Sequence, residues 1–190
     1  MKWIGSALLF TLALTGPILS ERVPSPIVDS IAIRGHRQLI HVYGARGTGA
    51  PVLMSSGDGG WMHLAPQVAE RLASRGFFVV GFDAKSYLES FTSGTSILRP
   101  QDVPGDYRLL AAYAAKGFTE KPILIGVSEG AGLSDLAATD TQTQQVIAGI
   151  IELGLSDLNE LGVVGSFEIR SSVRQFLKNV GTGSEFAAVR

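Results

Sequence analysis

Ser128 stands in the pattern Gly-x-Ser-x-Gly, which it forms with Gly126 and Gly130. An apolar run of β-forming residues precedes this pattern, and a small-residue segment with helical potential follows it. A strand, a sharp turn and a helix in this order are typical of a nucleophile elbow, in which a strained serine presents its hydroxyl to a carbonyl group. Glycine is abundant, with 23 of 190 residues, so an ordinary tight strand-to-helix turn is the alternative.

A second glycine-rich stretch, Gly-Asp-Gly-Gly-Trp at 57–61, follows a short apolar strand predicted at 52–55. A loop of this kind can expose a backbone N–H beside an elbow. The N–H of Gly59 or Gly60, together with that of Glu129, would then form an oxyanion hole for a tetrahedral intermediate. A plain tight turn, with Asp58 inside it, is the alternative.

Five further polar or aromatic residues fall near predicted strand ends. We expect Asp83 to cap the following turn rather than to bind a substrate or cofactor. Trp61 fits a pocket lining and a core position equally well, and His63 is expected to be a surface or capping residue. Asp157 and Glu160 lie in a predicted loop, where either could be an acid member of the site or a substrate contact, with turn capping as the alternative.

The elements that must position these residues alternate between strand and helix. We expect strands at 28–33, 39–43, 52–55, 77–82, 123–127 and 149–153. We expect helices from Leu64 to Gly76, from Asp102 to Gly117 and after the elbow, and an irregular segment at 84–99. Asp102 can cap the second of these helices, and the buried stripe of that helix would be formed by Tyr107, Leu110, Ala111 and Ala114. This order predicts an α/β fold with three layers and a mostly parallel sheet. In such sheets the active site lies at the carboxyl ends of the strands, so the residues named above should meet at one edge.

Composition excludes several classes of protein. The chain has 17% charged and 45% hydrophobic residues and a net charge of -1, which indicates a globular domain and no nucleic-acid partner. It has no cysteine, and His36, His41 and His63 lack ligand spacing, so we expect no metal site. Met62 stands where a dinucleotide fingerprint needs its third glycine, so no cofactor is predicted.

The first 20 residues have the pattern of a secretory signal peptide. Lys2 supplies a positive start, an apolar run follows at 3–14, and Ser20 offers a small residue for cleavage. A membrane anchor is the alternative, but the run is shorter than the roughly 20 residues that span a bilayer. We therefore expect export to the periplasm or beyond, a domain at 21–162 and an atypical tail at 163–190 with a helical pattern.

With both glycine motifs in place, the chain resembles the bacterial virulence domain of the VirJ/AcvB type, an exported branch of the α/β-hydrolase fold. The resemblance is carried by 56–61, 77–83, the elbow and 154–162. It implies a periplasmic location, possible secretion-system envelope partners and, in some members, hydrolysis of the aminoacyl ester of aminoacylated phosphatidylglycerol. That lipid ester would bring the protein close to a membrane. On this sequence the resemblance makes Ser128 the nucleophile and the amides of Gly59, Gly60 and Glu129 the oxyanion hole.

One departure from the family pattern concerns the general base. A hydrolase of this fold runs nucleophile, acid and histidine in chain order, yet no histidine follows Ser128. Without a base the hydroxyl is a poor nucleophile, so we expect a weak or inactive hydrolase. Two explanations stay open. We favour a C-terminal part that is missing or altered after about Gly162, but the tail has a helical apolar stripe and could be genuine. The alternative function is a non-catalytic binding or scaffold protein of the secretion envelope.

Overall fold

The computed structural model describes residues 25–92 and 97–154. Three sequence predictions lie outside these residues: the signal peptide at 1–20, the tail at 163–190, and the loop that carries Asp157 and Glu160. Within the described residues, no helix is both long enough and apolar enough to cross a membrane.

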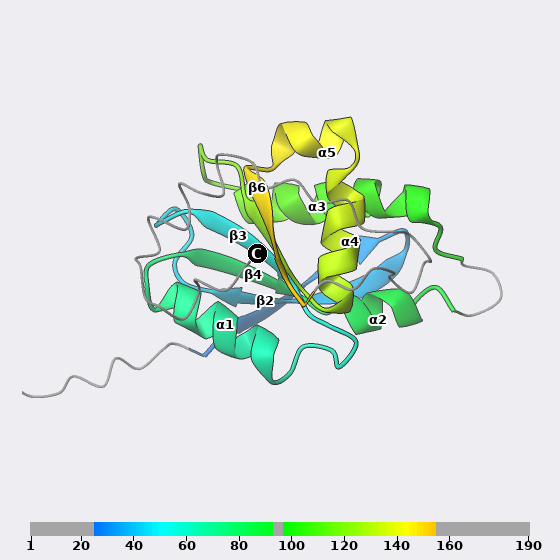
Figure 1. Cartoon of the computed structure of the whole chain (residues 1–190). Helices are drawn as coiled ribbons and strands as arrows, with labels where there is room; N and C mark the ends of the chain where they lie inside the picture. Colours follow the sequence, from blue (N-terminus) through cyan, green and yellow to red (C-terminus); the bar gives the residue numbers. More distant parts are fainter. Residues whose placement is uncertain (1–24, 93–96, 155–190) are drawn as a thin grey trace, which may run out of the picture.

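Six strands of the described part form one sheet in the order β1-β2-β4-β3-β5-β6 (Figure 1). β1 pairs with β2, and β2 with β4, in antiparallel fashion, whereas β4, β3, β5 and β6 run parallel to one another. The strands are β1 Ile27–Ile33, β2 His36–Tyr43, β3 Pro51–Ser55, β4 Phe78–Phe82, β5 Ile123–Val127 and β6 Gly149–Leu153. The prediction of a mostly parallel sheet is therefore confirmed, with an antiparallel hairpin at one edge.

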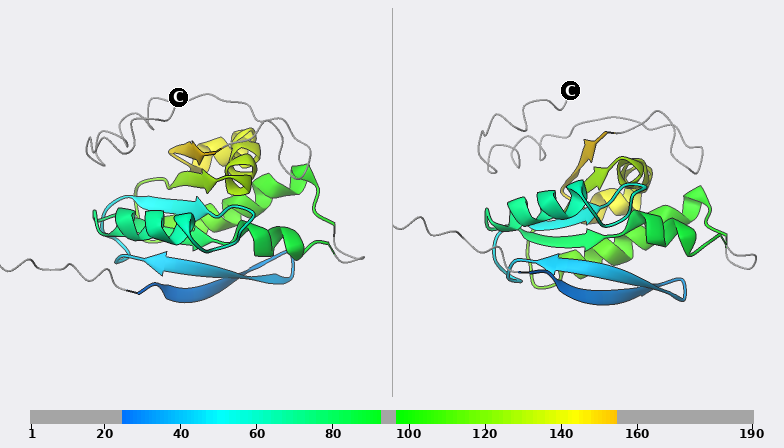
Figure 2. Two further views of the ribbon diagram at one scale, coloured as in Figure 1. Left: turned by 60° about the horizontal axis from the view of Figure 1, so that its bottom comes forward. Right: turned by 90° about the horizontal axis from the view of Figure 1, so that it is seen from below.

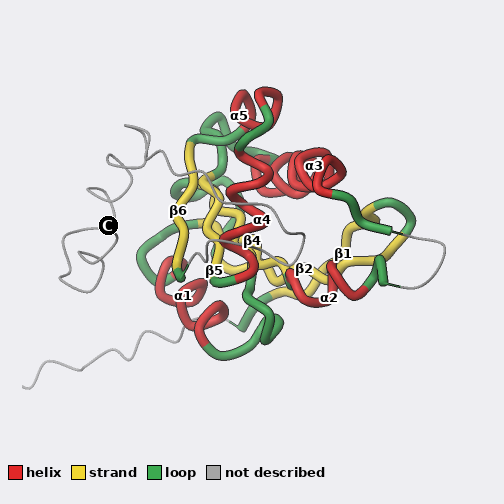
Figure 3. The backbone as a smooth tube through the Cα atoms, turned by 45° about the vertical axis from the view of Figure 1, so that its right-hand side comes forward, coloured by secondary structure: helices red, strands yellow, loops and turns green. Residues whose placement is uncertain are grey.

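Helices cover both faces of this sheet and give three layers (Figure 2). α1, Leu64–Ala73, packs in one apolar cluster with the strand residues of its own face. The other face carries α2 Ala84–Glu89, α3 Val103–Ala115 and α4 Glu129–Ala138 in a second, larger cluster, with α5 Thr141–Val146 beside α3. Figure 3 shows the strands running between α1 and α3.

The central strands are short and apolar because both of their faces are covered. Every residue of β3 and of β5 is buried, as is typical of parallel strands between two helical layers. The β1–β2 turn instead uses Arg34 and Gly35, which have φ of 51° and 85°. Two residues in succession with positive φ suit the twist of a two-residue hairpin.

Two local predictions differ from the structure. The segment predicted to be irregular contains α2, which forms because Asp83 caps it and because Ala84 and Tyr87 are buried on its inner side. Asp102 precedes α3 as expected, but its side chain makes no capping bond to the helix. Its carboxylate accepts from the Arg99 N–H at 2.9 Å and pairs with Arg34 at 2.7 Å.

Candidate active site

Ser128 lies at the turn between β5 and α4, at the carboxyl end of the parallel strands. Its backbone has φ 50° and ψ -118°, a conformation that a non-glycine residue rarely adopts. Its N–H donates to the Leu153 carbonyl at 2.7 Å, and its own carbonyl accepts from the Ala131 N–H at 2.8 Å. Ser128 is exposed, so β6 and α4 hold a strained serine with its side chain open to solvent.

The two flanking glycines make this turn possible. A Cβ on Gly126 would lie 2.3 Å from the Gly130 carbonyl oxygen, and a Cβ on Gly130 would lie 2.2 Å from the Ser56 carbonyl oxygen. No side chain fits at either position without moving backbone. The strand, turn and helix expected around Ser128 are therefore present, while its role as nucleophile stays a prediction.

The glycine-rich loop at 57–61 lies against the elbow. A Cβ on Gly57 would be 3.1 Å from the Ser128 Cβ and 3.7 Å from its Oγ, so Gly57 is the loop residue in contact with the serine. The Gly60 N–H donates to the Gly57 carbonyl at 3.0 Å, and the Gly59 N–H donates to Asp58 Oδ1 at 3.0 Å. The two predicted oxyanion donors of the loop thus have partners within it, and their role at the site stays a prediction.

Trp61 attaches this loop to the sheet. Its indole N–H donates to the Tyr43 hydroxyl at 3.2 Å, and its ring stacks on His41 with centroids 5.2 Å apart. The ring lies directly over Gly81 of β4, where a Cβ would be 2.2 Å from it. Trp61 therefore has a packing role. Sequence reasoning missed Gly81, although a glycine inside an apolar strand signals a close approach of this kind.

Buried hydroxyl groups support the elbow from beneath. The Ser55 and Tyr107 hydroxyls lie 2.9 Å apart, and Ser134 donates to the Gly130 carbonyl at 2.8 Å. All three side chains are fully buried. The sequence predicted Tyr107 only as part of the apolar stripe of α3, but its hydroxyl also ties α3 to the end of β3.

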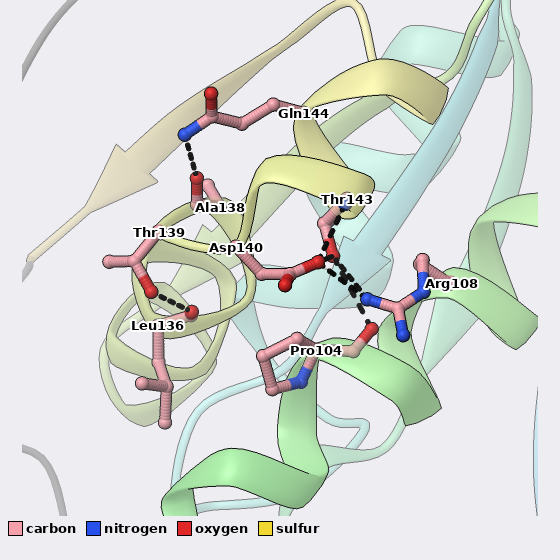
Figure 4. A network of polar contacts seen from close by, with 8 residues as sticks. All are labelled: Pro104, Arg108, Leu136, Ala138, Thr139, Asp140, Thr143 and Gln144. Carbon is pink, nitrogen blue, oxygen red and sulfur yellow. Dashed lines mark hydrogen bonds and ion pairs between the residues drawn. The ribbon is translucent and has the colours of Figure 1, made fainter.

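The far end of α4 is fixed by a polar network (Figure 4). Asp140 caps α5 by accepting from the Thr143 N–H at 2.8 Å, and it pairs with Arg108 of α3. Gln144 donates to the Ala138 carbonyl at 2.8 Å. The helix that carries the elbow is therefore anchored at both ends.

Asp83 and His63 border the site without taking part in a catalytic bond. Asp83 accepts from the Ser86 N–H at 3.1 Å, which confirms the predicted capping role. His63 occupies the N-cap position of α1, is exposed and makes no side-chain capping bond. Its φ of 55° and ψ of -110° nearly repeat those of Ser128, so α1 and α4 both start from a strained residue, whereas α2, which follows β4 at the same edge, starts from Asp83 in an extended conformation.

The histidines of β2 are far from Ser128. β2 and β5 are separated by β4 and β3, and three inter-strand steps amount to about 14 Å. His36 packs edge-on against Phe91, and His41 stacks on Trp61, where burial lowers the pKa of its imidazole. Neither can accept the Ser128 proton in this arrangement. The described residues also contain no cluster of three or more His, Asp or Glu that could hold a metal.

Glu152 is a buried acid that the sequence analysis did not single out. It is 7% exposed, and neither carboxyl oxygen has a hydrogen-bond partner among the described residues. Burial and, secondarily, the charge of Asp135 raise the pKa of Glu152 to about 7. The available signal was an acidic residue inside the otherwise apolar strand at 149–153.

A family model described as a bacterial virulence protein (VirJ) matches residues 50–177. The chain belongs to this family. The match contains the loop at 57–61, the elbow and Glu152, so the resemblance expected from the two glycine motifs is confirmed. A search of curated proteins gave no match to this VirJ chain.

Solved structures similar to the VirJ chain are α/β-hydrolases. A putative dienelactone hydrolase from Klebsiella pneumoniae aligns with a TM-score of 0.53 at 14% identity, over 78% of this chain and 65% of that one. A soluble variant of monoglyceride lipase from Saccharomyces cerevisiae aligns with a TM-score of 0.52 at 17% identity, over 70% of this chain and 46% of that one. A thioesterase domain from the curacin biosynthetic pathway aligns with a TM-score of 0.51 at 19% identity, over 82% of this chain and 50% of that one. These likenesses show the α/β-hydrolase fold, and the VirJ chain spans 39% to 65% of the lengths of the solved structures compared.

Proposed function

We propose that this chain is an exported serine hydrolase of the VirJ type with an incomplete triad, in which Ser128 attacks, only slowly for want of a histidine base, an acyl or aminoacyl ester such as that of aminoacylated phosphatidylglycerol. The observation that carries the proposal is the backbone of Ser128, strained at φ 50° with its side chain exposed between α4 and the 57–61 loop. Strain of this kind persists only where surrounding structure enforces it, and it is concentrated at functional sites.

The proposed oxyanion hole combines the Glu129 amide at the start of α4 with an amide of the 57–61 loop. The position of Gly57 supports the loop contribution, because a Cβ on Gly57 would lie only 3.7 Å from the Ser128 Oγ. The loop backbone is therefore close to the place where an oxyanion would form. If Gly59 or Gly60 supplies the donor, its present bond within the loop must open when substrate binds.

Family membership supports the ester substrate and the envelope location. Residues 1–20 would direct export, and a lipid ester would place the enzyme beside a membrane. Secretion-system envelope proteins are the proposed partners. Because the similar solved structures share less than 25% identity with this chain, their substrates add nothing to the choice of ester.

A non-catalytic binding or scaffold protein of the secretion envelope is the second candidate. It is favoured by one observation: all three histidines precede Ser128, and those of β2 lie too far away to act as its base. Such a protein would keep the fold and the elbow without turning over an ester.

Labelling with a fluorophosphonate probe separates the two candidates. We expect slow labelling of the full chain that is lost in Ser128→Ala and retained in Ser86→Ala, a matched change at an exposed serine. Hydrolysis of an activated aryl ester should be weak and should follow the same pattern. Absence of Ser128-dependent labelling, with a known serine hydrolase labelled in parallel, would favour the scaffold.

A further inference from the structure

Glu152 and the elbow occupy neighbouring positions on two paired strands. Gly126 is the register partner of Glu152, and Val127 is that of Leu153. The Leu153 carbonyl, one peptide beyond Glu152, accepts the Ser128 N–H at 2.7 Å. Any movement of β6 at Glu152 is therefore transmitted directly to the backbone of the strained serine.

The Glu152 side chain projects toward the first turns of α4. Partners in parallel strands project to the same face of the sheet, and a Cβ on Gly126 would meet Gly130 and Ala131 of α4. Asp135, four residues after Ala131, lies on the same side of that helix and is 3% exposed. Glu152 is therefore enclosed between its own strand and the helix that carries the elbow.

Among the described residues, the charged groups on the elements next to Glu152 are all negative. The charged residues of α4 are Glu129 and Asp135, and β5, β6 and α5 add none besides Glu152 itself. No described residue gives the Glu152 carboxyl oxygens a hydrogen bond. A carboxylate in this position would be desolvated without compensation, whereas a neutral carboxylic acid is tolerated at far lower free energy.

We propose that Glu152 is a positioning residue for the elbow: its protonated form allows β6 to pack against α4 with Ser128 in place, and its ionisation loosens this packing. The ionised form requires water or separation of α4 from β6. Either change shifts the Leu153 carbonyl, which holds the Ser128 amide. The site would then be best ordered on the acid side of neutrality and would loosen as the pH rises. The link to reactivity rests on the proposed function of Ser128; the link to elbow structure does not.

Nuclear magnetic resonance of the full chain tests the structural link without any substrate. We expect the Glu152 carboxyl carbon to titrate with a midpoint near pH 7, since burial and Asp135 raise the pKa of Glu152 to about 7. We expect the Ser128 amide resonance to shift with the same midpoint. A Glu152 midpoint in the usual range of glutamates would overturn the proposal. A Ser128 amide resonance that does not shift with the Glu152 titration would also overturn it.

Two variants extend the test. In Glu152→Gln, which mimics the protonated form, the pH-dependent shift of the Ser128 amide with a midpoint near pH 7 should disappear. Asp135→Asn should lower the Glu152 midpoint. The matched control is Glu120→Gln, at an exposed site, which should leave both titrations unchanged. The wild-type titration decides the question even if a variant fails to fold.

Probe labelling then tests the link to reactivity. The ratio of wild-type to Glu152→Gln labelling rates should fall between pH 6 and pH 8.5, because only the wild type loosens. A constant ratio would contradict the link to reactivity. If neither protein is labelled at any pH, the proposed function fails. The link between Glu152 and the Ser128 amide is then still decided by the nuclear magnetic resonance titrations alone.

Discussion

Ser128 owes its conformation to its neighbours rather than to its own preference. A residue held in such a sparsely populated conformation costs of order 1–3 kcal/mol, which the packed structure around it must supply. Gly126 and Gly130 supply it by letting α4 approach β5 and the end of β3 at backbone contact. The glycines of the motif are thus packing requirements as well as features of the turn.

We expect Gly130→Ala to destabilise the fold by about 1–3 kcal/mol or more, because its Cβ would lie 2.2 Å from the Ser56 carbonyl oxygen. Urea unfolding followed by circular dichroism measures the change. Gly59→Ala is the control: nothing lies within 4 Å of a Cβ there, and its free energy of unfolding should change by no more than about 0.5 kcal/mol. Equal effects of the two changes would contradict this account.

At the scale of single residues, the sequence predicts the roles that depend only on neighbours a few positions away in the chain. Gly126, Ser128 and Gly130 form a pattern within five positions, and Asp83 caps a turn three residues away. Gly81 and Glu152 could not be assigned in this way. Gly81 matters because Trp61 folds onto it, and Glu152 matters because β6 pairs with the elbow strand. Both facts depend on contacts that only the assembled sheet provides.

Among the elements, the 57–61 loop depends on the Trp61 side chain, which packs on β4, the strand next to β3. We expect Gly81→Ala to displace the Trp61 ring, since the new Cβ would lie 2.2 Å from it. Overpacking of this kind costs typically about 1–3 kcal/mol of stability. Unfolding monitored by tryptophan fluorescence and the rate of Ser128 labelling should both change.

A double-mutant cycle checks the cause of that effect. Trp61→Ala removes the ring, so adding Gly81→Ala to it should cost much less than Gly81→Ala alone. Additive losses would mean that Gly81 matters for another reason, such as strand propensity.

The hydroxyl of Tyr107 joins α3 to β3 beneath the elbow. We expect Tyr107→Phe to destabilise the chain by about 1–3 kcal/mol, because Ser55 is fully buried and would lose its partner. Urea unfolding measures the loss. Adding Ser55→Ala should restore part of it, whereas Tyr113→Phe, which removes a hydroxyl bonded to exposed Asp29, should have a smaller effect.

Strands and long helices could be predicted from the sequence because their patterns are regular. The apolar runs of β3, β4 and β5 and the buried stripe of α3 appear in the structure where they were expected. α2 was missed because it has only six residues and no clear period. Its stability comes from the Asp83 cap and from Tyr87, whose hydroxyl donates to buried Asp106 at 2.7 Å.

For the whole molecule, Glu152 makes stability depend on pH. The pKa of this carboxyl is raised from 4.5 to about 7 in the folded chain. Below pH 4.5 both states are protonated and its stabilising contribution is fully present. As the pH rises toward 7 the unfolded chain ionises first, so this contribution is lost, up to about 3 kcal/mol in total.

We therefore expect the free energy of unfolding to fall between about pH 4.5 and 7, and the slope to be reduced in Glu152→Gln. Denaturant titrations at fixed ionic strength measure both. Asp29, Asp102 and Asp140 act in the opposite direction at lower pH, because hydrogen bonds or ion pairs lower the pKa of each. His41 opposes Glu152 below about pH 6.5, because burial lowers the pKa of its imidazole, but it does so equally in the wild type and in Glu152→Gln, so the difference between the two slopes reports Glu152. A wild-type slope matched by the variant would contradict the assignment to Glu152.

The strand pairing also implies an order of assembly. The β1–β2 hairpin joins neighbours such as Ile33 and His36, whereas β5 needs Val52 on one side and Gly149 on the other. Local hairpins form within about 1–10 μs, but distant pairings wait for long loops to close. The strained serine is thus expected to be among the last features to form, because its N–H bond to the Leu153 carbonyl requires β6. Pulsed hydrogen exchange during refolding should protect the amides of β2 before that of Ser128.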